Sequence, residues 1–110
     1  MRRLPRTVTN WSYSALEAVP KDAVGLYAFW LRDKKKCVYV GQSTNQTIRQ
    51  RLRQHWHHSS NEELRDWLRN FGEFLDLCVY PHLGPTERIR RMERALIRKW
   101  QPHANRQHAG

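Results

Sequence analysis

Two short apolar segments joined by a charged turn constrain the fold of this chain more than any other feature. Residues 25–31 (GLYAFWL) are rich in aromatic side chains, residues 37–41 (CVYVG) form a second run, and the turn at 33–36 between them is fully charged (DKKK). Apolar runs of this length on either side of a short polar turn predict two strands. We therefore expect a β-hairpin here.

Helical periodicity accounts for much of the remaining chain. Ile48, Leu52 and Trp56 recur at four-residue spacing, and Ser60 with Glu63 has the pattern of a capping box. Glycines and prolines mark where the elements end. The sequence predicts a short helix over 11–19, a helix over 48–56, a helix from Ser60 to a stop at Gly72, a third strand over 74–80 and a long helix over 87–100.

This order of elements predicts an α/β fold, with a small three-stranded antiparallel sheet flanked by helices. A length of 110 residues is expected to form one domain. We expect residues 1–23 to form a basic N-terminal arm and a short helix, residues 24–106 to form the folded domain, and residues 107–110 to form a C-terminal tail.

The charge of the chain indicates a polyanionic partner. Twenty Lys and Arg against ten Asp and Glu leave a net charge of +10. Residues 1–58 contain eleven basic and three acidic side chains, so most of the excess lies in this half. Nucleic acid is the first candidate partner and an anionic membrane the second, while the alternative is that the charge only maintains solubility.

Several protein classes are excluded by what the sequence lacks. The longest apolar stretch, 26–31, is too short to span a bilayer, and no signal-peptide core follows Met1. Cys37 and Cys78 are far apart and belong to no CxxC motif, which indicates buried thiols in a reducing compartment. We expect a cytoplasmic protein, and not a secreted, transmembrane or zinc-finger protein.

Glu93 falls inside the apolar stripe of the last predicted helix, which includes Ile89, Leu96 and Trp100. A carboxylate in that position is costly unless a cation or several hydrogen-bond donors meet it. Two interpretations remain open. Glu93 either pairs with a buried arginine or binds a metal ion at the bottom of a cleft.

Four more polar residues border the predicted core. Arg51 and His55 are four residues apart and share one helix face. Tyr27 and Tyr39 share one sheet face in any hairpin register whose paired numbers have an even sum, and a sum of 66 would place them directly opposite. Each of these positions is also compatible with ordinary packing, because border arginines snorkel and cross-strand aromatic pairs are common.

In this order, the residues resemble the GIY-YIG nuclease family. Gly25-Leu26-Tyr27 resembles the GIY element, Tyr39-Val40-Gly41 resembles the YIG element, and Arg51-Leu52 with His55 is similar to the family's helical motif. The resemblance extends from about Val24 to Arg106, so the folded domain is expected to be a GIY-YIG-like nuclease domain.

Three further elements belong to this resemblance. His58-Ser59-Ser60 resembles a His-Ser-Ser element of some homing endonucleases, Glu93 corresponds to the family's metal-binding glutamate, and Asn105 corresponds to its late asparagine. Two departures are visible: the interval from Gly41 to Arg51 is about two residues longer than in several branches, and Gln42 stands where some repair-type members have lysine.

The resemblance implies a metal-dependent endonuclease that hydrolyses DNA phosphodiester bonds through a stand-alone GIY-YIG domain. Glu93 would hold Mg²⁺ or Mn²⁺, Arg51 would meet the phosphate, and either tyrosine would serve as general base. The implied catalytic residues are Tyr27, Tyr39, Arg51, His55, Glu93 and Asn105, and the implied substrate contacts are Gly41, Arg49, Arg53 and His58.

Other functions remain open from the sequence. His55, His57 and His58 with one of the cysteines could bind zinc, although no paired-cysteine motif supports such a site. A non-catalytic nucleic-acid-binding module of the same fold is the main alternative, and a small RNA-binding or ribosome-associated protein is a third. We expect DNA to be recognised mainly through its backbone, unless a homodimer or a separate partner supplies target specificity.

Overall fold

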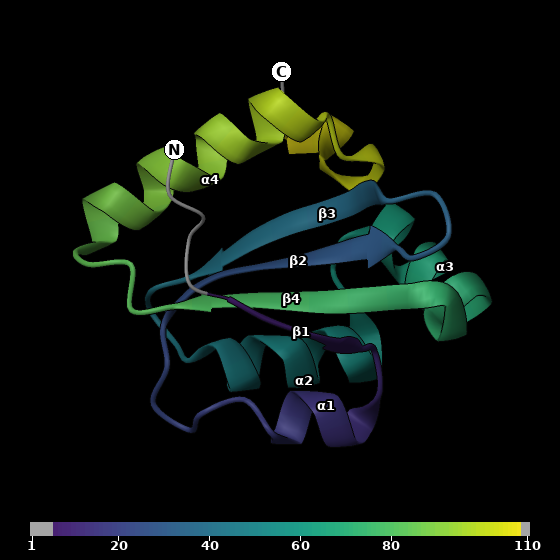
Figure 1. The fold of residues 1–110 in the computed structure, drawn as a ribbon, viewed down its shortest axis with the longest axis horizontal. Coiled ribbons are helices and arrows are strands. Elements are labelled where there is room, and N and C mark those ends of the chain that lie inside the picture. Colours follow the sequence, from purple (N-terminus) through teal and green to yellow (C-terminus); the bar gives the residue numbers. More distant parts are fainter. Residues whose placement is uncertain (1–5, 109–110) are drawn as a thin grey trace.

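The hairpin lies at the centre of the fold in the computed structural model, which describes residues 6–108 and the side chains of 6–105. Strand β2 (Gly25–Leu31) pairs antiparallel with β3 (Lys36–Ser43), which confirms the predicted hairpin. On its other side, β2 pairs antiparallel with β4 (Leu75–Pro81). A further strand, β1 (Thr7–Asn10), completes a four-stranded sheet in the order β1-β4-β2-β3 (Figure 1).

The sheet therefore has one more strand than the three that we expected. Residues 7–10, assigned to the basic arm, form β1 and pair with residues 76–79 of β4. All four residues of β1 are exposed, so the segment has no buried face to produce the alternating pattern that identifies a strand. Residues 1–5 of the predicted arm and residues 109–110 of the predicted tail lie outside the described residues.

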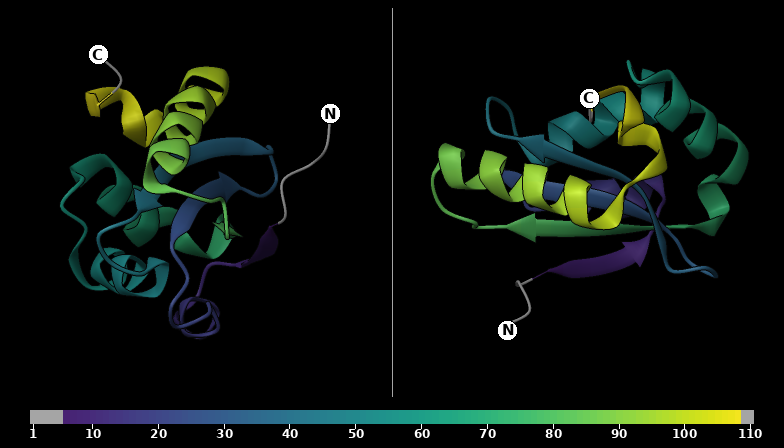
Figure 2. Two further views of the ribbon diagram at one scale, coloured as in Figure 1. Left: turned by 90° about the vertical axis from the view of Figure 1, so that its left-hand side faces the viewer. Right: turned by 90° about the horizontal axis from the view of Figure 1, so that it is seen from above.

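Helices cover both faces of the sheet. Helices α1 (Tyr13–Glu17) and α2 (Ile48–His58) lie on one face, and α4 (Thr86–Trp100) lies on the other, as the two rotated views show (Figure 2). Helix α3 (Glu62–Phe71) adds its apolar side to the core on the α2 face. Short 3₁₀ turns, η1 (Gly72–Phe74) and η2 (His103–His108), follow α3 and α4. No helix in the described part of the chain is long and apolar enough to cross a membrane.

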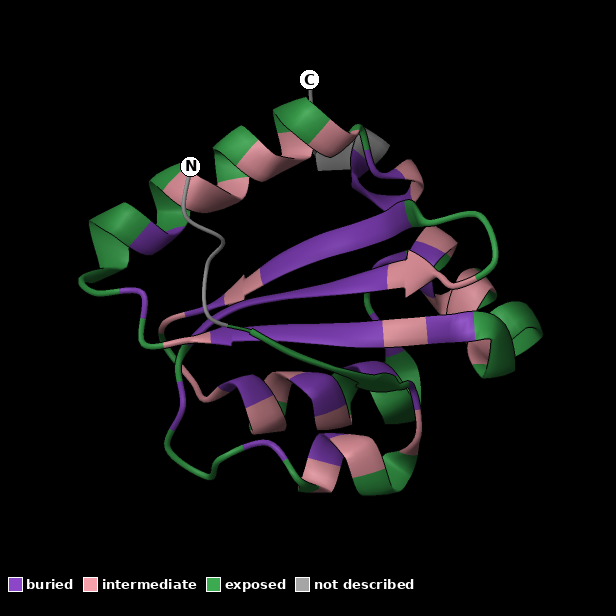
Figure 3. Cartoon of the chain, viewed as in Figure 1, coloured by how far each residue is buried: buried purple, intermediate pink, exposed green. Residues whose placement is uncertain are grey.

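Buried residues dominate strands β2, β3 and β4 and recur along the helices (Figure 3). Their side chains form two apolar cores, one on each face of the sheet. The core on the α4 face includes Cys37 and Cys78, which are buried free thiols, as predicted. The apolar stripe of α4 packs against this core with the residues that the periodicity indicated, namely Ile89, Met92, Leu96, Ile97 and Trp100. The core on the other face contains both Tyr27 and Tyr39.

The hairpin register places the two tyrosines on one face but not opposite each other. Tyr27 pairs with Gly41, and Phe29 pairs with Tyr39, so the paired numbers have an even sum other than 66. A register shift follows between Phe29 and Trp30, beyond the two tyrosines. Tyr27 and Tyr39 are therefore diagonal neighbours on the edge strand and the strand beside it.

Candidate active site

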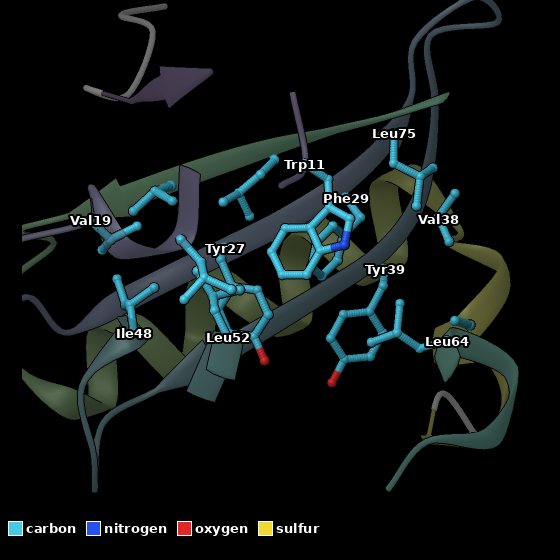
Figure 4. Packing of buried hydrophobic residues seen from close by; sticks show 14 of the residues in the cluster. Trp11, Val19, Tyr27, Phe29, Val38, Tyr39, Ile48, Leu52, Leu64 and Leu75 are labelled. Atoms are coloured by element: carbon cyan, nitrogen blue, oxygen red, sulfur yellow. The ribbon is translucent and has the colours of Figure 1, made fainter. Parts of the chain in front are cut away.

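The two tyrosines form the centre of a polar cluster at the β3 side of the sheet. Tyr27 has no exposed surface and Tyr39 retains 8%, and their ring centroids are 6.2 Å apart. Figure 4 shows both phenol oxygens at the same side of the buried cluster, away from the strands. The shared face that the hairpin pattern predicted therefore brings both hydroxyl groups to one place.

The two glycines of the motifs allow close packing, Gly41 beside the tyrosine rings and Gly25 against the backbone of β4. A Cβ atom added to Gly41 would lie 2.5 Å from both Cζ and Oη of Tyr27 and 2.8 Å from Cε2 of Tyr39. A Cβ atom added to Gly25 would collide with the carbonyl oxygen of Tyr80. Gly41, which we expected to contact substrate, is buried, and its visible role is to let the ring of Tyr27 lie against β3.

His55 joins the cluster through a chain of buried hydrogen bonds. Its Nε2 lies 2.6 Å from Oη of Tyr27, and its Nδ1 lies 2.9 Å from Oγ of Ser59. The Asn61 backbone N–H donates to the same Ser59 oxygen. His55 and Ser59 are 4% and 1% exposed, so water does not replace these partners.

This chain of bonds couples the tautomer of His55 to the protonation of Tyr27. Ser59 already accepts a hydrogen bond from the Asn61 N–H. Among the described residues, His55 Nδ1 is the acceptor that the hydroxyl proton of Ser59 can reach. The opposite tautomer would leave the Ser59 proton buried without an acceptor, which is unfavourable. The Nε2-protonated tautomer satisfies all three groups only when Tyr27 is a phenolate, because a neutral Tyr27 would also need an acceptor for its buried proton.

Burial and one cation set the electrostatics of the cluster. Burial raises the pKa of Tyr27 and of Tyr39 above the ordinary value, whereas the guanidinium of Arg51 acts on both phenols in the opposite direction. Burial, with a smaller contribution from Arg51, lowers the pKa of His55 to about 3. His55 is consequently neutral near pH 7, and Arg51 is the group that favours a phenolate.

Glu93 approaches the cluster from the other face of the sheet. Helix α4 contacts β3, and the charge of Glu93 raises the pKa of Tyr39. Glu93 is half-buried, and burial raises the pKa of its carboxyl group, while Arg94 and Arg90 act in the opposite direction. Among the side chains that the structure describes, none forms a hydrogen bond or an ion pair with this carboxylate. Of the two interpretations of Glu93, pairing with a buried arginine therefore finds no partner within residues 6–105.

The donor set around Glu93 fits a divalent cation that keeps most of its water. No group of three or more His, Cys, Asp or Glu side chains within the described residues could hold a metal ion. Mg²⁺ is commonly bound by one or two carboxylates together with water and substrate phosphate, so a single half-buried carboxylate is compatible with it. Zinc would need a closed set of three or four nitrogen and sulfur ligands, which the exposed His57 and His58 do not form with His55.

Asn105 forms its side-chain hydrogen bonds with the edge strand β3 and not with the tyrosine hydroxyl groups. Its Oδ1 accepts from the Val40 backbone N–H at 2.8 Å, and its Nδ2 donates to the Val40 carbonyl oxygen at 2.9 Å. Val40 lies between Tyr39 and Gly41, on the outermost strand of the sheet. Asn105 therefore satisfies edge backbone groups as a neighbouring strand would and holds both motif residues in position.

Three predicted substrate contacts lie apart from the cluster or bind other groups. Arg49 donates through Nε and Nη2 to the carbonyl oxygen of Val19. Arg53 donates two hydrogen bonds to the carboxylate of Glu17, the closer at 2.7 Å. His58 is exposed and lies 3.4 Å from Nη1 of Arg65. The structure does not bring these three residues to the phenols.

Ser59 and Asn61 are the residues whose roles the sequence did not reveal. Ser59 follows His55 by four residues, so the i, i+4 spacing could have identified a contact on one helix face. Asn61 caps α3 by accepting from the Leu64 N–H, and it donates to the Ala104 carbonyl next to Asn105. Because the latter contact is long-range, no local pattern could have predicted it.

Comparisons with known proteins agree with this geometry. A family model described as the GIY-YIG catalytic domain matches residues 23–107, which is most of the chain. Neither a curated protein nor a solved structure gives a significant match. The matched range includes the tyrosine pair, Arg51, His55, Glu93 and Asn105.

Proposed function

The chain belongs to the GIY-YIG catalytic-domain family, a family of nuclease domains, and from this premise we propose that it is a metal-dependent DNA endonuclease. The observation that most supports the proposal is the cluster in which Arg51 acts on two buried phenols and His55 is bonded to one of them. Hydrolysis of a phosphodiester needs a proton acceptor, positive charge at the phosphate and stabilisation of the leaving oxygen.

The tyrosine pair would supply the proton acceptor. Tyr39 raises the pKa of Tyr27, whereas Tyr27 lowers the pKa of Tyr39, so the two phenols differ in how readily they ionise. The Nε2–H of His55 points at the Tyr27 oxygen and would stabilise its phenolate by hydrogen bonding. One phenolate of the pair would then accept the proton of the attacking water.

Arg51 and Glu93 would handle the charge of the phosphate. The planar guanidinium of Arg51 is suited to two non-bridging oxygens, and its position beside the phenols would place the phosphate close to the base. Glu93 would hold Mg²⁺ or Mn²⁺ together with water and phosphate oxygens. When bound, such a cation neutralises the charge that develops on the phosphate and the departing oxygen.

Nicking of supercoiled plasmid with and without Mg²⁺ tests the proposal. Glu93→Gln keeps the size of the side chain and removes its charge, so we expect at least a hundredfold loss of cleavage, since the metal contributes several kcal/mol. The fold should persist, because burial already disfavours the charged carboxylate and a neutral amide is easier to bury. DNA binding without metal should be retained.

Glu87→Gln is the matched control. Glu87 lies exposed in the first turn of the same helix. The Glu87→Gln protein should cleave at the same rate as the unchanged protein. A Glu93→Gln protein that melts early yet cuts normally while folded would contradict the metal-binding role. Tight DNA binding by the unchanged protein with no cleavage in any divalent metal would instead indicate the non-catalytic binding module.

A further inference from the structure

A groove with aromatic and basic side chains adjoins the active site at the C-terminal end of α2. One pocket of about 260 Å³ lies between α2 and α3, and no acidic residue lines it. A second pocket of about 380 Å³ shares Trp11, Trp56, Leu68 and Arg69 with the first, so the two adjoin, and Glu73 lines the far part of the second pocket only. The side chains that define this Trp56 groove are Trp11, Trp56, His57, His58, Arg65 and Arg69.

Trp56 has an unusual position for a residue on an apolar helix stripe. Ile48 and Leu52 of the same stripe are fully buried, whereas Trp56 remains 43% exposed. Its indole is supported by two aromatic neighbours, with ring centroids 5.4 Å away for Trp11 and 5.5 Å for Tyr13. A large, supported and partly uncovered indole is a surface on which a flat ring can stack.

The chemistry of the groove matches a nucleotide. Arg69 is exposed, forms no hydrogen bond or ion pair with another described side chain, and lines both pockets. Arg65 and two histidines extend the basic lining on one side. An aromatic platform next to cations is the combination by which proteins bind single-stranded nucleic acid, through base stacking and phosphate contacts.

We propose that the Trp56 groove binds an unpaired nucleotide of the DNA substrate, beside the phosphate that is cut. The inference rests on the DNA-cleaving function proposed above and adds a substrate class to it. His55 lines the groove and is bonded to Tyr27, so the groove and the catalytic cluster meet at one side chain. Bases within an intact duplex are already stacked and paired, so substrates with unpaired ends, flaps or gaps are favoured.

Fluorescence anisotropy in EDTA tests the groove without cleavage. The probes are a short labelled single strand of thymidines and a duplex of the same length. Trp56→Ala should weaken single-strand binding about tenfold, since stacking is worth about 1–3 kcal/mol per base, and should leave duplex binding unchanged. Trp56→Phe keeps a stacking ring and should restore most of the loss. Phe74→Ala, which removes a comparably exposed aromatic outside both pockets, should change neither affinity.

A second pair of variants avoids the aromatic packing altogether. Arg69→Ala should weaken single-strand binding, whereas Arg98→Ala, an exposed position on α4, should not. The proposal would be overturned if the groove variants lost the same affinity for the single strand and the duplex, or if neither variant lost affinity. It would also be overturned if the groove bound an acidic peptide through Trp56 more tightly than it binds the single strand. The binding assay contains no metal, so its outcome can be interpreted even if the protein does not nick plasmid. If the protein nicks plasmid normally and Trp56→Ala does not change single-strand affinity, the groove proposal is refuted and the nuclease proposal stands.

Discussion

At the scale of single residues, Ser59 influences which ring nitrogen of His55 carries the proton. Its hydroxyl favours the His55 proton on Nε2 when Tyr27 is a phenolate, because its oxygen already accepts from the Asn61 N–H and its proton needs Nδ1 as the acceptor. Ser59 is therefore a positioning residue, and its effect on the phenol of Tyr27 passes through the imidazole. The tautomer distinguishes this role from simple packing.

Ser59→Ala should change both the tautomer and the rate. Without the hydroxyl donor, the Nε2-protonated tautomer loses its partner at Nδ1, and nitrogen-15 spectra of the histidine rings should show less of this tautomer in Ser59→Ala than in the unchanged protein. Cleavage should fall about 2- to 10-fold, since one hydrogen bond contributes about 0.5–1.5 kcal/mol. Ser59→Thr retains the hydroxyl and is the matched control. An unchanged tautomer in Ser59→Ala would refute the assignment.

His55 also predicts how stability depends on pH. Its pKa is about 3 in the folded protein, while an unfolded histidine titrates near 6.5. Between these values the unfolded state binds the extra proton, so the free energy of unfolding falls as pH falls below 6.5 and is fully retained above it. The contribution is a few kcal/mol. Denaturant titrations from pH 7.5 to 4 should show a weaker dependence in His55→Gln, and identical slopes would contradict a buried neutral imidazole.

Residue types alone could not predict which arginine of α2 lies beside the two phenols. Arg49, Arg51 and Arg53 alternate along α2, and only Arg51 acts on the phenols. The helical angle places Arg51 beside His55 and turns the other two toward α1. Their partners, the carbonyl of Val19 and the carboxylate of Glu17, come from a segment about 30 residues earlier, which helical periodicity does not reveal.

At the scale of elements, prediction succeeded where burial leaves a pattern. The hairpin, α4 and the tyrosine face were predicted correctly because each packs against a core on at least one side. Strand β1 was missed because it holds its place through backbone pairing with β4 alone. Helix α3 begins after Asn61 and not after Ser60, since Asn61 is buried and accepts from the Leu64 N–H, whereas Ser60 is exposed.

The contact between α1 and α2 gives a prediction at this scale. Arg53→Ala removes the bidentate pair with Glu17 but no group of the catalytic cluster. We expect unchanged cleavage, unchanged DNA affinity and a small decrease in melting temperature, since the pair is partly exposed. Glu17→Gln should give the same melting shift without changing the rate. A loss of DNA affinity confined to Arg53→Ala would restore Arg53 to the substrate-binding residues.

At the scale of the whole molecule, the charge excess of the first half of the sequence does not translate into one binding surface. Three of its arginines are engaged in structural contacts: Arg32 with Asp76, Arg49 with Val19 and Arg53 with Glu17. Arg51 lowers the pKa of the two buried phenols. Arg65 and Arg69, from the less basic half, line the groove beside them. Folding therefore combines cations from both halves around the cluster.

This redistribution predicts the salt dependence of DNA binding. Each phosphate contact on duplex DNA releases counterions and contributes about 0.9 to the slope of log affinity against log salt. Affinity should fall steeply with salt, yet with a smaller slope than the eleven basic residues of the first half would give if all met phosphates. Arg69→Ala should reduce the slope on a single strand, where each contact contributes about 0.7, and Arg53→Ala should leave it unchanged. Affinity that does not change between low and moderate salt would rule out phosphate as the main contact and with it the nucleic-acid partner.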